Sequence, residues 1–303
     1  KKDKGTEDEF GLEKIVNDKN LDLSMPNMAK AILIIRNYFK TRLDIIPQFY
    51  SFLKNKVIMV YIATEELNDA FQLFTVMNNT GIKLRNSDIL KANNLEVIED
   101  EKKRKEKAKK WEEIESYFGD KFDNFLSIIR TILVKKKANY NLLKEYNDKI
   151  YEPKEYDRET QEYKKVKPLL QRGEQTFETI EKYYKIYVEL FDKINEPDPK
   201  KQEMNNYLIL MENGFEADIW IAPVLEFYNK FKENRLVDFI KSIDRKFSAD
   251  WINSLTPTDR IENINKIIKK IEESHSPEDI IESQFLKFDY ENLKRIVKGN
   301  IYG

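Results

Sequence analysis

The stretch FQLFTVMNNTGIKLRNSDILKA, residues 71–92, predicts how this chain folds locally. Apolar residues recur at helical spacing before it, and Gly81 suits the left-handed position just past a helix C-terminus. Asn86 or Ser87 is then expected to cap the next helix, with Asp88 in its first turn. The stretch therefore predicts a helix, a glycine stop, a short extended link and a second helix.

Working outward, the same helical spacing recurs along most of the chain. Apolar stripes of this kind occur at 28–39, 67–77, 122–133, 177–194, 236–251 and 261–271. Only KVIMVYIAT, about 56–64, has the length and β-branched content of a strand. The polar, tyrosine-rich stretch that contains Pro153 and Pro168 favours short helices and loops. We therefore expect a mainly α, multi-helix protein whose one short strand belongs to an incomplete N-terminal α/β domain.

Two helix starts have clear sequence signals. Thr256 is expected to cap a helix, because a proline follows it in the first turn and Asp259 is the acid at the third position. The single histidine, His275, precedes Ser276, which is expected to cap a helix that opens with Pro277. The charged segment 99–110 fits either a long solvated helix or a hinge between subdomains.

The composition excludes several kinds of site. The chain of 303 residues has no cysteine and one histidine, so it has no disulfide, thiolate zinc site, cysteine nucleophile or His-pair metal motif. It contains no P-loop, dinucleotide fingerprint or G-x-S-x-G elbow. No apolar run reaches the roughly 18 residues of a membrane span, and no signal peptide opens it. We expect a cytoplasmic protein that does not bind membranes.

Charge gives a weak indication of nucleic-acid binding. Lysine and arginine number 53 against 54 acidic residues, so the net charge is -1. Basic residues nevertheless cluster at 102–110, 135–137 and 164–172. Such runs on helices are usually solvated faces. The candidates for DNA contact are Lys102, Lys103, Arg104, Lys135, Lys136 and Lys137.

Other polar and aromatic groups have the spacing of a site but also a simpler explanation. Glu65 with Asp69, and Glu112 with Glu115, lie at helical spacing suited to a hard cation, yet such pairs arise by chance in so charged a chain. Tyrosines near Tyr183, Tyr184 and Tyr187 are of the type that stacks bases, but their spacing favours core packing.

The 71–92 stretch also resembles a known family motif, F-x-x-x-N-x-x-G-x-x-L-x-x-x-D-[IL]-[LI]-K-[AN]. The matching residues are Phe74, Asn78, Gly81, Leu84, Asp88, Ile89, Leu90, Lys91 and Ala92. This motif is similar to one of the GmrS-like family, DGQQR-motif proteins with a ParB- or sulfiredoxin-like N-terminal domain, as in GmrSD type IV restriction enzymes. DIWIAPVLEFY and TPTDRIENINKII resemble that family's helical continuation.

The resemblance implies a domain plan and candidate residues. Residues 1–100 would end the GmrS-like N-terminal domain and 101–303 would form a helical domain, with a further break near 195–203. Asn78, Gly81, Leu84, Asp88 and Lys91 would line a nucleotide pocket or have structural roles. Neither the upstream DGQQR segment nor the downstream HNH nuclease motif occurs in these residues, so the chain reads as a fragment of a longer parent.

The first functional hypothesis is the helical central region of a GmrS-like, nucleotide-dependent restriction and phage-defence protein. Its partners would be DNA and the upstream and downstream domains. NTP and a divalent metal would serve the parent, and no cofactor and no catalysis are assigned to this chain. The alternative is a stand-alone helical protein-interaction module with no nucleic-acid role. A third hypothesis, a hydrolase that uses carboxylates, rests only on the acidic pairs.

Overall fold

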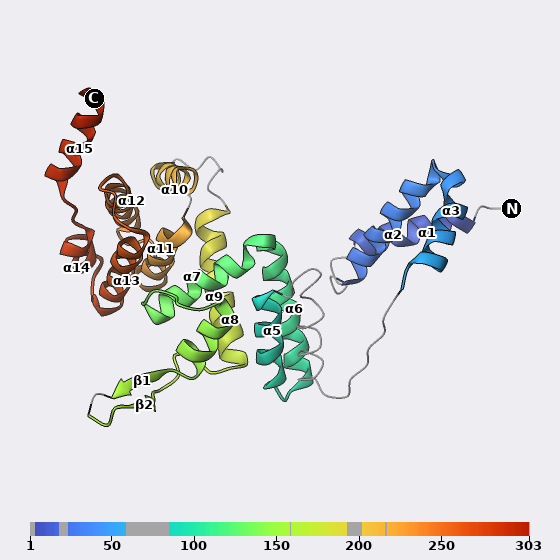
Figure 1. The fold of residues 1–303 in the computed structure, drawn as a ribbon, viewed down its shortest axis with the longest axis horizontal. Helices are drawn as coiled ribbons and strands as arrows, with labels where there is room; N and C mark the ends of the chain where they lie inside the picture. Colours follow the sequence, from blue (N-terminus) through green and yellow to red (C-terminus); the bar gives the residue numbers. More distant parts are fainter. Residues whose placement is uncertain are drawn as a thin grey trace. The chain divides into compact units, whose positions relative to one another are not determined.

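The computed structural model describes residues 4–17, 24–58, 85–157, 159–192, 202–215 and 217–302, which form two compact units (Figure 1). The first unit is Lys1–Lys83 and the second is Leu84–Gly303. The described residues are mainly helical, and this confirms the predicted fold class.

The first unit contains three described helices. They are α1 (Lys4–Asn17), α2 (Ser24–Lys40) and α3 (Ile46–Lys56), with a 3₁₀ turn at Leu43–Ile45 before α3. Helix α1 packs along α2. On α2, Ala29 is buried, at 3% exposed. The predicted stripe of α2 lies on another face, where Met28, Ile32 and Ile35 are exposed.

The predicted strand at 56–64 falls mostly outside the described residues. Its first residue, Lys56, is the last residue of α3, and Val57 is extended without pairing. The predicted helix at 67–77 and the motif residues Asn78, Gly81 and Leu84 also lie outside the described part of the chain.

The second unit begins with three helices and a short helical turn. They are α5 (Asn86–Glu96), α6 (Glu101–Phe118), α7 (Phe122–Val134) and α8 (Leu142–Glu145), the last running into a π-helical turn at Tyr146–Tyr151. The charged segment after 99 is thus a helix, and Trp111 on its inner face packs edge-on against Phe122 of α7 and Phe177. A hinge in this segment is excluded because α6 is continuous.

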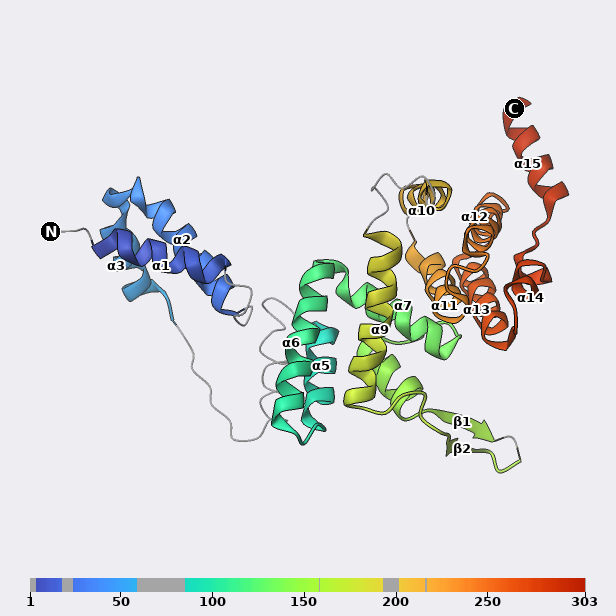
Figure 2. The ribbon, with the colours of Figure 1, turned by 180° about the vertical axis from the view of Figure 1, so that it is seen from behind.

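A β-hairpin interrupts the helices where the sequence favoured short helices and loops. Strands β1 (Lys154–Asp157) and β2 (Glu162–Lys165) pair antiparallel. All but one of their side chains are exposed, so no apolar alternation marks the strands in the sequence. In both ribbon views the hairpin projects away from the helices around it (Figures 1 and 2).

The remaining helices enclose the main core. They are α9 (Glu174–Phe191), α10 (Gln202–Gly214), α11 (Ile221–Phe231), α12 (Leu236–Ile252), α13 (Pro257–Glu273), α14 (Pro277–Ile281) and α15 (Tyr290–Tyr302), with 3₁₀ turns at Asp218–Trp220 and Gln284–Leu286. Helix α11 packs against α7, α9, α12 and α13, and its residues 221–228 are all buried. This position makes α11 the centre of the core.

Both predicted helix starts are confirmed. Thr256 caps α13 and forms a capping box with Asp259. Ser276 does the same for α14 with Asp279, whose carboxylate also accepts the backbone N–H of His275. His275 is exposed and lies just before this helix.

The two compact units divide at a different place from the predicted domain boundary near residue 100, which stays a prediction. Helix α5 packs against α6, α7, α8 and α9, so it belongs to the second unit, and the division falls between Lys83 and Leu84. The apolar side of α5, including the fully buried Leu90, is what joins it to that core. The further break near 195–203 stays a prediction, because 193–201 lie outside the described residues.

Within the described ranges, no helix is both long enough and apolar enough to cross a bilayer.

Candidate functional site

The described motif residues lie on α5 and make structural contacts. The Asp88 carboxylate accepts the backbone N–H of Arg85 at 3.0 Å. Arg85 is therefore the residue that caps α5, whereas the sequence predicted Asn86 or Ser87 as the cap. The Lys91 ammonium pairs with Glu112 of α6 at 2.8 Å. Arg85 also donates to the Gly119 carbonyl at 3.2 Å, at the far end of α6. These contacts hold α5 against α6.

A carboxylate next to this cluster has a shifted pKa. Burial raises the pKa of Glu115, and the neighbouring Asp88 carboxylate adds to the shift. Lys91 lies nearby and acts in the opposite direction. The predicted cation-binding pair of Glu112 with Glu115 therefore has a lysine beside it. In the part of the chain that the structure describes, no cluster of three or more metal-ligating side chains occurs.

The lysine-rich segment of α6 is tied to α9. Lys103 pairs with Glu174 at 3.1 Å, and Lys107 pairs with Glu178 at 3.7 Å. The Arg104 guanidinium instead donates to the Ile98 carbonyl at 2.9 Å and so closes the turn before its own helix. Two of the three cations predicted here for DNA contact thus bond within the fold.

The second basic cluster, 135–137, is tied to α13. Lys135 pairs with Glu272 at 2.9 Å, and Lys137 donates to the Thr258 hydroxyl at 2.8 Å. Lys136 and the Lys102 ammonium have no recorded partner among the described residues. Most of the predicted DNA contacts therefore have a second use, which is to hold helices together.

A buried ion pair fixes the loop that carries this second cluster. Arg130 bonds Glu145 with two nitrogens at 2.9 and 2.5 Å, and both side chains are almost fully buried. Glu145 also accepts the backbone N–H groups of Asn139 and Tyr140, while Arg130 donates to the Lys136 carbonyl. Burial alone would raise the pKa of Glu145, but the Asn139 N–H and the Arg130 guanidinium outweigh it and hold that pKa below the usual value.

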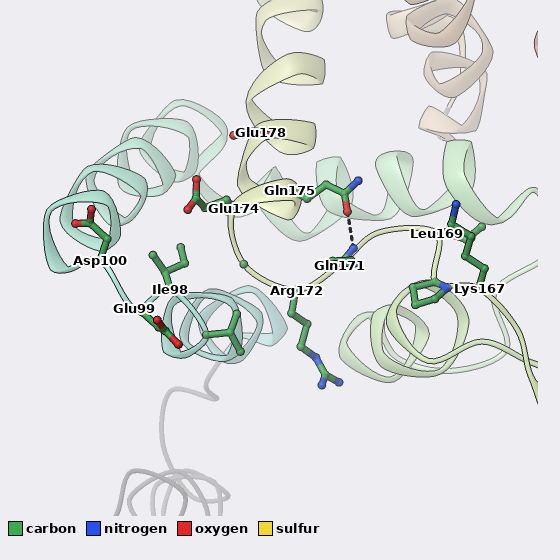
Figure 3. Close-up of a pocket in the computed structure, with 13 residues that line it drawn as sticks. Ile98, Glu99, Asp100, Lys167, Leu169, Gln171, Arg172, Glu174, Gln175 and Glu178 are labelled. Atoms are coloured by element: carbon green, nitrogen blue, oxygen red, sulfur yellow. Dashed lines mark hydrogen bonds between the residues drawn. The ribbon is translucent and has the colours of Figure 1, made fainter.

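A groove of about 1210 Å³ lies beside the start of α9 in the second unit (Figure 3). The α5–α6 connection lines one side with Glu99 and Asp100, and the start of α9 lines another with Glu174 and Glu178. Arg172 lies on the loop before α9; it pairs with Glu152 at 3.0 Å and covers the Tyr151 ring. The groove therefore has an acidic rim, and its arginine is already bound to the protein.

A buried polar network that the sequence did not indicate holds Gln171 and Gly173, two residues that line the groove. Asn94 accepts the Gly173 N–H at 2.9 Å and donates to the Tyr151 hydroxyl at 3.0 Å. The Tyr151 hydroxyl lies 3.2 Å from that of Thr176, which in turn donates to the Gln171 carbonyl at 3.0 Å. These bonds fix the loop before α9, which lines part of the groove.

Gly173 is required in this loop for two reasons. Its φ is +94°, a conformation that side chains rarely adopt. A Cβ there would also lie 2.9 Å from the Val97 side chain. The sequence signal for this position is a glycine four residues before the helical stripe at 177–194.

The tyrosines considered for base stacking are core residues instead. Tyr183 is 3% exposed and donates to Glu226 at 2.6 Å. Burial, and next the Glu226 carboxylate, raise the Tyr183 pKa well above its ordinary value. Tyr187 stacks on Phe191, and burial raises its pKa to about 12. The core-packing interpretation is confirmed.

Comparisons with known proteins give no relative: no family model, no curated protein and no solved structure matches this chain. The resemblance to the GmrS-like family therefore rests on the quoted sequence stretches alone.

Proposed function

We propose that this chain is a non-catalytic helical scaffold, the central region of a GmrS-like, nucleotide-dependent restriction and defence protein that acts in the cytoplasm. The observation that carries the proposal is that charged side chains predicted to contact nucleotide or DNA form ion pairs with other helices of the chain. Lys91 pairs with Glu112, Lys103 with Glu174, and Lys135 with Glu272. Groups held in ion pairs between helices are suited to fixing geometry.

The geometry of the second unit supports a scaffold in two further ways. Its ion pairs connect separate helices, α5 to α6, α6 to α9 and the end of α7 to α13, and the last two join helices that are distant in sequence. Its core is continuous from α5 to α14. A body of this kind keeps its ends at a fixed separation, and this is what a nucleotide domain and a nuclease domain would need from the segment between them.

The catalytic part of the proposal is tested by phosphate release. The purified chain is incubated with each common NTP, Mg²⁺ and plasmid DNA, and both phosphate and DNA cleavage are measured. We expect background rates that equal those of Lys91→Met and Asp88→Asn. Turnover that either substitution abolishes would contradict the proposal, because it would place these residues in an active site.

The scaffold part is tested by a distance measurement that uses the absence of native cysteine. Spin labels at Lys109→Cys on α6 and Lys266→Cys on α13 report on the second unit. A pair on one helix, Glu262→Cys and Lys269→Cys, serves as the rigid control. We expect equally narrow distance distributions, unchanged by NTP or DNA. A broad or ligand-dependent distribution for the first pair alone would rule out a rigid body.

One observation favours the alternative, a stand-alone protein-interaction module. The α2 stripe is apolar and open, with Met28 58% and Ile35 57% exposed. Exposed apolar patches are typical of protein-binding surfaces. This module would show no salt-dependent affinity for nucleic acid, whereas phosphate contacts weaken steeply as salt rises.

A further inference from the structure

The β1–β2 hairpin separates its side chains into two unlike faces. Lys154 pairs with Lys165 and Tyr156 with Tyr163. Paired residues share a face and neighbours along a strand alternate, so these four side chains lie together. We call them the Lys–Tyr face. The opposite face has Glu155, Asp157, Glu162 and Lys164.

Charge is distributed unequally between these faces. The Lys–Tyr face has two ammonium groups and no carboxylate among its four ladder residues. On the other face, three carboxylates share one ammonium, and Lys164 pairs with Asp157 at 2.5 Å. The lysines of the Lys–Tyr face lie directly opposite each other, and like charges so placed destabilise a hairpin. Neither Lys154 nor Lys165 has a recorded partner among the described residues.

The two tyrosines are also unused by the fold. Tyr156 is 52% and Tyr163 is 71% exposed, and their rings meet at 5.3 Å and 62°. No helix covers the hairpin in either ribbon view (Figures 1 and 2). An aromatic pair this open contributes little core burial, so its rings are free to stack on a ligand.

The base of the hairpin is firmly held. Val166 donates to the Pro153 carbonyl at 2.9 Å, and Leu169 donates to the Ile150 carbonyl at 2.8 Å. Tyr151, just before β1, is 4% exposed and belongs to the network that fixes the loop before α9. The Lys–Tyr face is therefore presented on a rigid stem.

We propose that the Lys–Tyr face binds single-stranded nucleic acid, with Lys154 and Lys165 on phosphates and with bases stacked on Tyr156 and Tyr163. Sites for single strands combine these two elements, cations that follow the backbone and aromatic rings on which bases stack. In a duplex the base faces are covered by their neighbours, so the rings would have nothing to stack on. This proposal does not rest on the scaffold function.

The test measures the anisotropy of a labelled oligonucleotide of about 12 nucleotides, within the range of known single-strand sites. The full chain is titrated at about 50 and about 200 mM salt. DNA and RNA single strands and the matching duplex are compared. We expect both single strands to bind, the duplex to bind more weakly, and affinity to fall with salt.

Tyrosine variants separate stacking from hairpin folding. Tyr156→Thr with Tyr163→Thr keeps strand propensity but removes the rings, and it is expected to weaken binding about tenfold or more. Tyr156→Phe with Tyr163→Phe keeps the strand propensity and the rings, so this variant should bind as the wild type does. Tyr140→Thr removes another exposed tyrosine and should have no effect. Equal loss in the threonine and phenylalanine variants would overturn stacking.

Lysine variants identify the face. Lys154→Gln with Lys165→Gln should lower the slope of log affinity against log salt by about 1.4, the value for two phosphate contacts on a single strand. Lys266→Gln with Lys287→Gln removes two exposed lysines outside the predicted basic clusters and should leave the slope unchanged. No binding at low salt, preference for duplex, or a larger effect of the second pair would each overturn the proposal. None of these results alters the test of phosphate release.

Discussion

Helices α2 and α11 both contain an apolar run, but only one of them is buried. In α11 every residue from Ile221 to Tyr228 is buried between α7, α9, α12 and α13. In α2 the predicted stripe is open, and Met28 and Ile35 are 58% and 57% exposed. An amphipathic pattern thus predicts that a helix forms, and the number of neighbouring helices decides how much that pattern stabilises the fold.

The largest contrast between these helices should come from removing a core ring. Phe227 of α11 is fully buried and stacks on Phe239 at 4.0 Å, so Phe227→Ala should cost about 3 to 5 kcal/mol in the free energy of unfolding. Ile35→Ala on α2 should change it by less than about 0.5 kcal/mol. Urea unfolding followed by circular dichroism measures both. The three tryptophans, Trp111, Trp220 and Trp251, all lie in the second unit and report on it separately.

A similarly large effect is expected at the buried ion pair. Arg130→Met leaves the Glu145 carboxylate buried without its cation, and this should cost about 3 to 5 kcal/mol. Replacing both residues, by Arg130→Met with Glu145→Leu, should cost much less, because no charge is then left unpaired. A double variant as unstable as the single one would show that the pair contributes more than charge balance.

The same pair predicts how stability depends on pH. The pKa of Glu145 is lowered in the folded state. A lowered pKa contributes stability above the unfolded value, and this contribution is lost as pH falls through the folded value. The stability difference between wild type and Glu145→Gln should therefore be constant near neutral pH and shrink as pH falls below the ordinary glutamate range. A difference that grows in acid would contradict this assignment.

A moderate effect is expected at the groove. Gly173→Ala combines a φ of +94° with a Cβ 2.9 Å from Val97, so it should cost about 1 to 3 kcal/mol. Adding Val97→Ala to Gly173→Ala should remove the part of this cost that comes from the close contact, and should leave the part that comes from the backbone conformation. The double-mutant cycle measures this coupling in urea. Complete additivity would mean that the contact with Val97 is not what limits this position.

The smallest effects should occur at the ion pairs between helices. Lys91→Met should cost about 0.5 to 1 kcal/mol, because its side chain is 20% exposed and ties α5 to α6. Lys105→Met is a matched control, because Lys105 pairs with Glu101 on the same helix. The Lys105 side chain is 77% exposed. That change should cost about 0.3 kcal/mol. Equal effects would show that Lys91 does not join the helices.

The helical part of the fold was predictable because its signals are local. The caps at Thr256 and Ser276 involve residues three positions apart, and core stripes such as 122–133 repeat within one element. The hairpin was missed because its residues are exposed on both faces, so period-two alternation of apolar residues never arises.

The candidate site was less predictable because its contacts are distant in sequence. Asn94 bonds a backbone group 79 residues away at Gly173, and no spacing rule connects the two. The lysine clusters were visible, but whether a glutamate such as Glu174 neutralises them depends on how α6 and α9 pack. The sequence identifies the clustered lysines, but only the packing of the helices shows which of them have carboxylate partners.

The second unit is a closed helical core, whereas α2 and α3 of the first unit leave apolar side chains exposed. Hydrogen exchange followed by mass spectrometry, on the intact chain, compares the two units directly. We predict the slowest exchange in α11 and α13 and fast exchange in α2 and α3. Protection of α2 equal to that of α11 would contradict it, because such protection requires a covered apolar face.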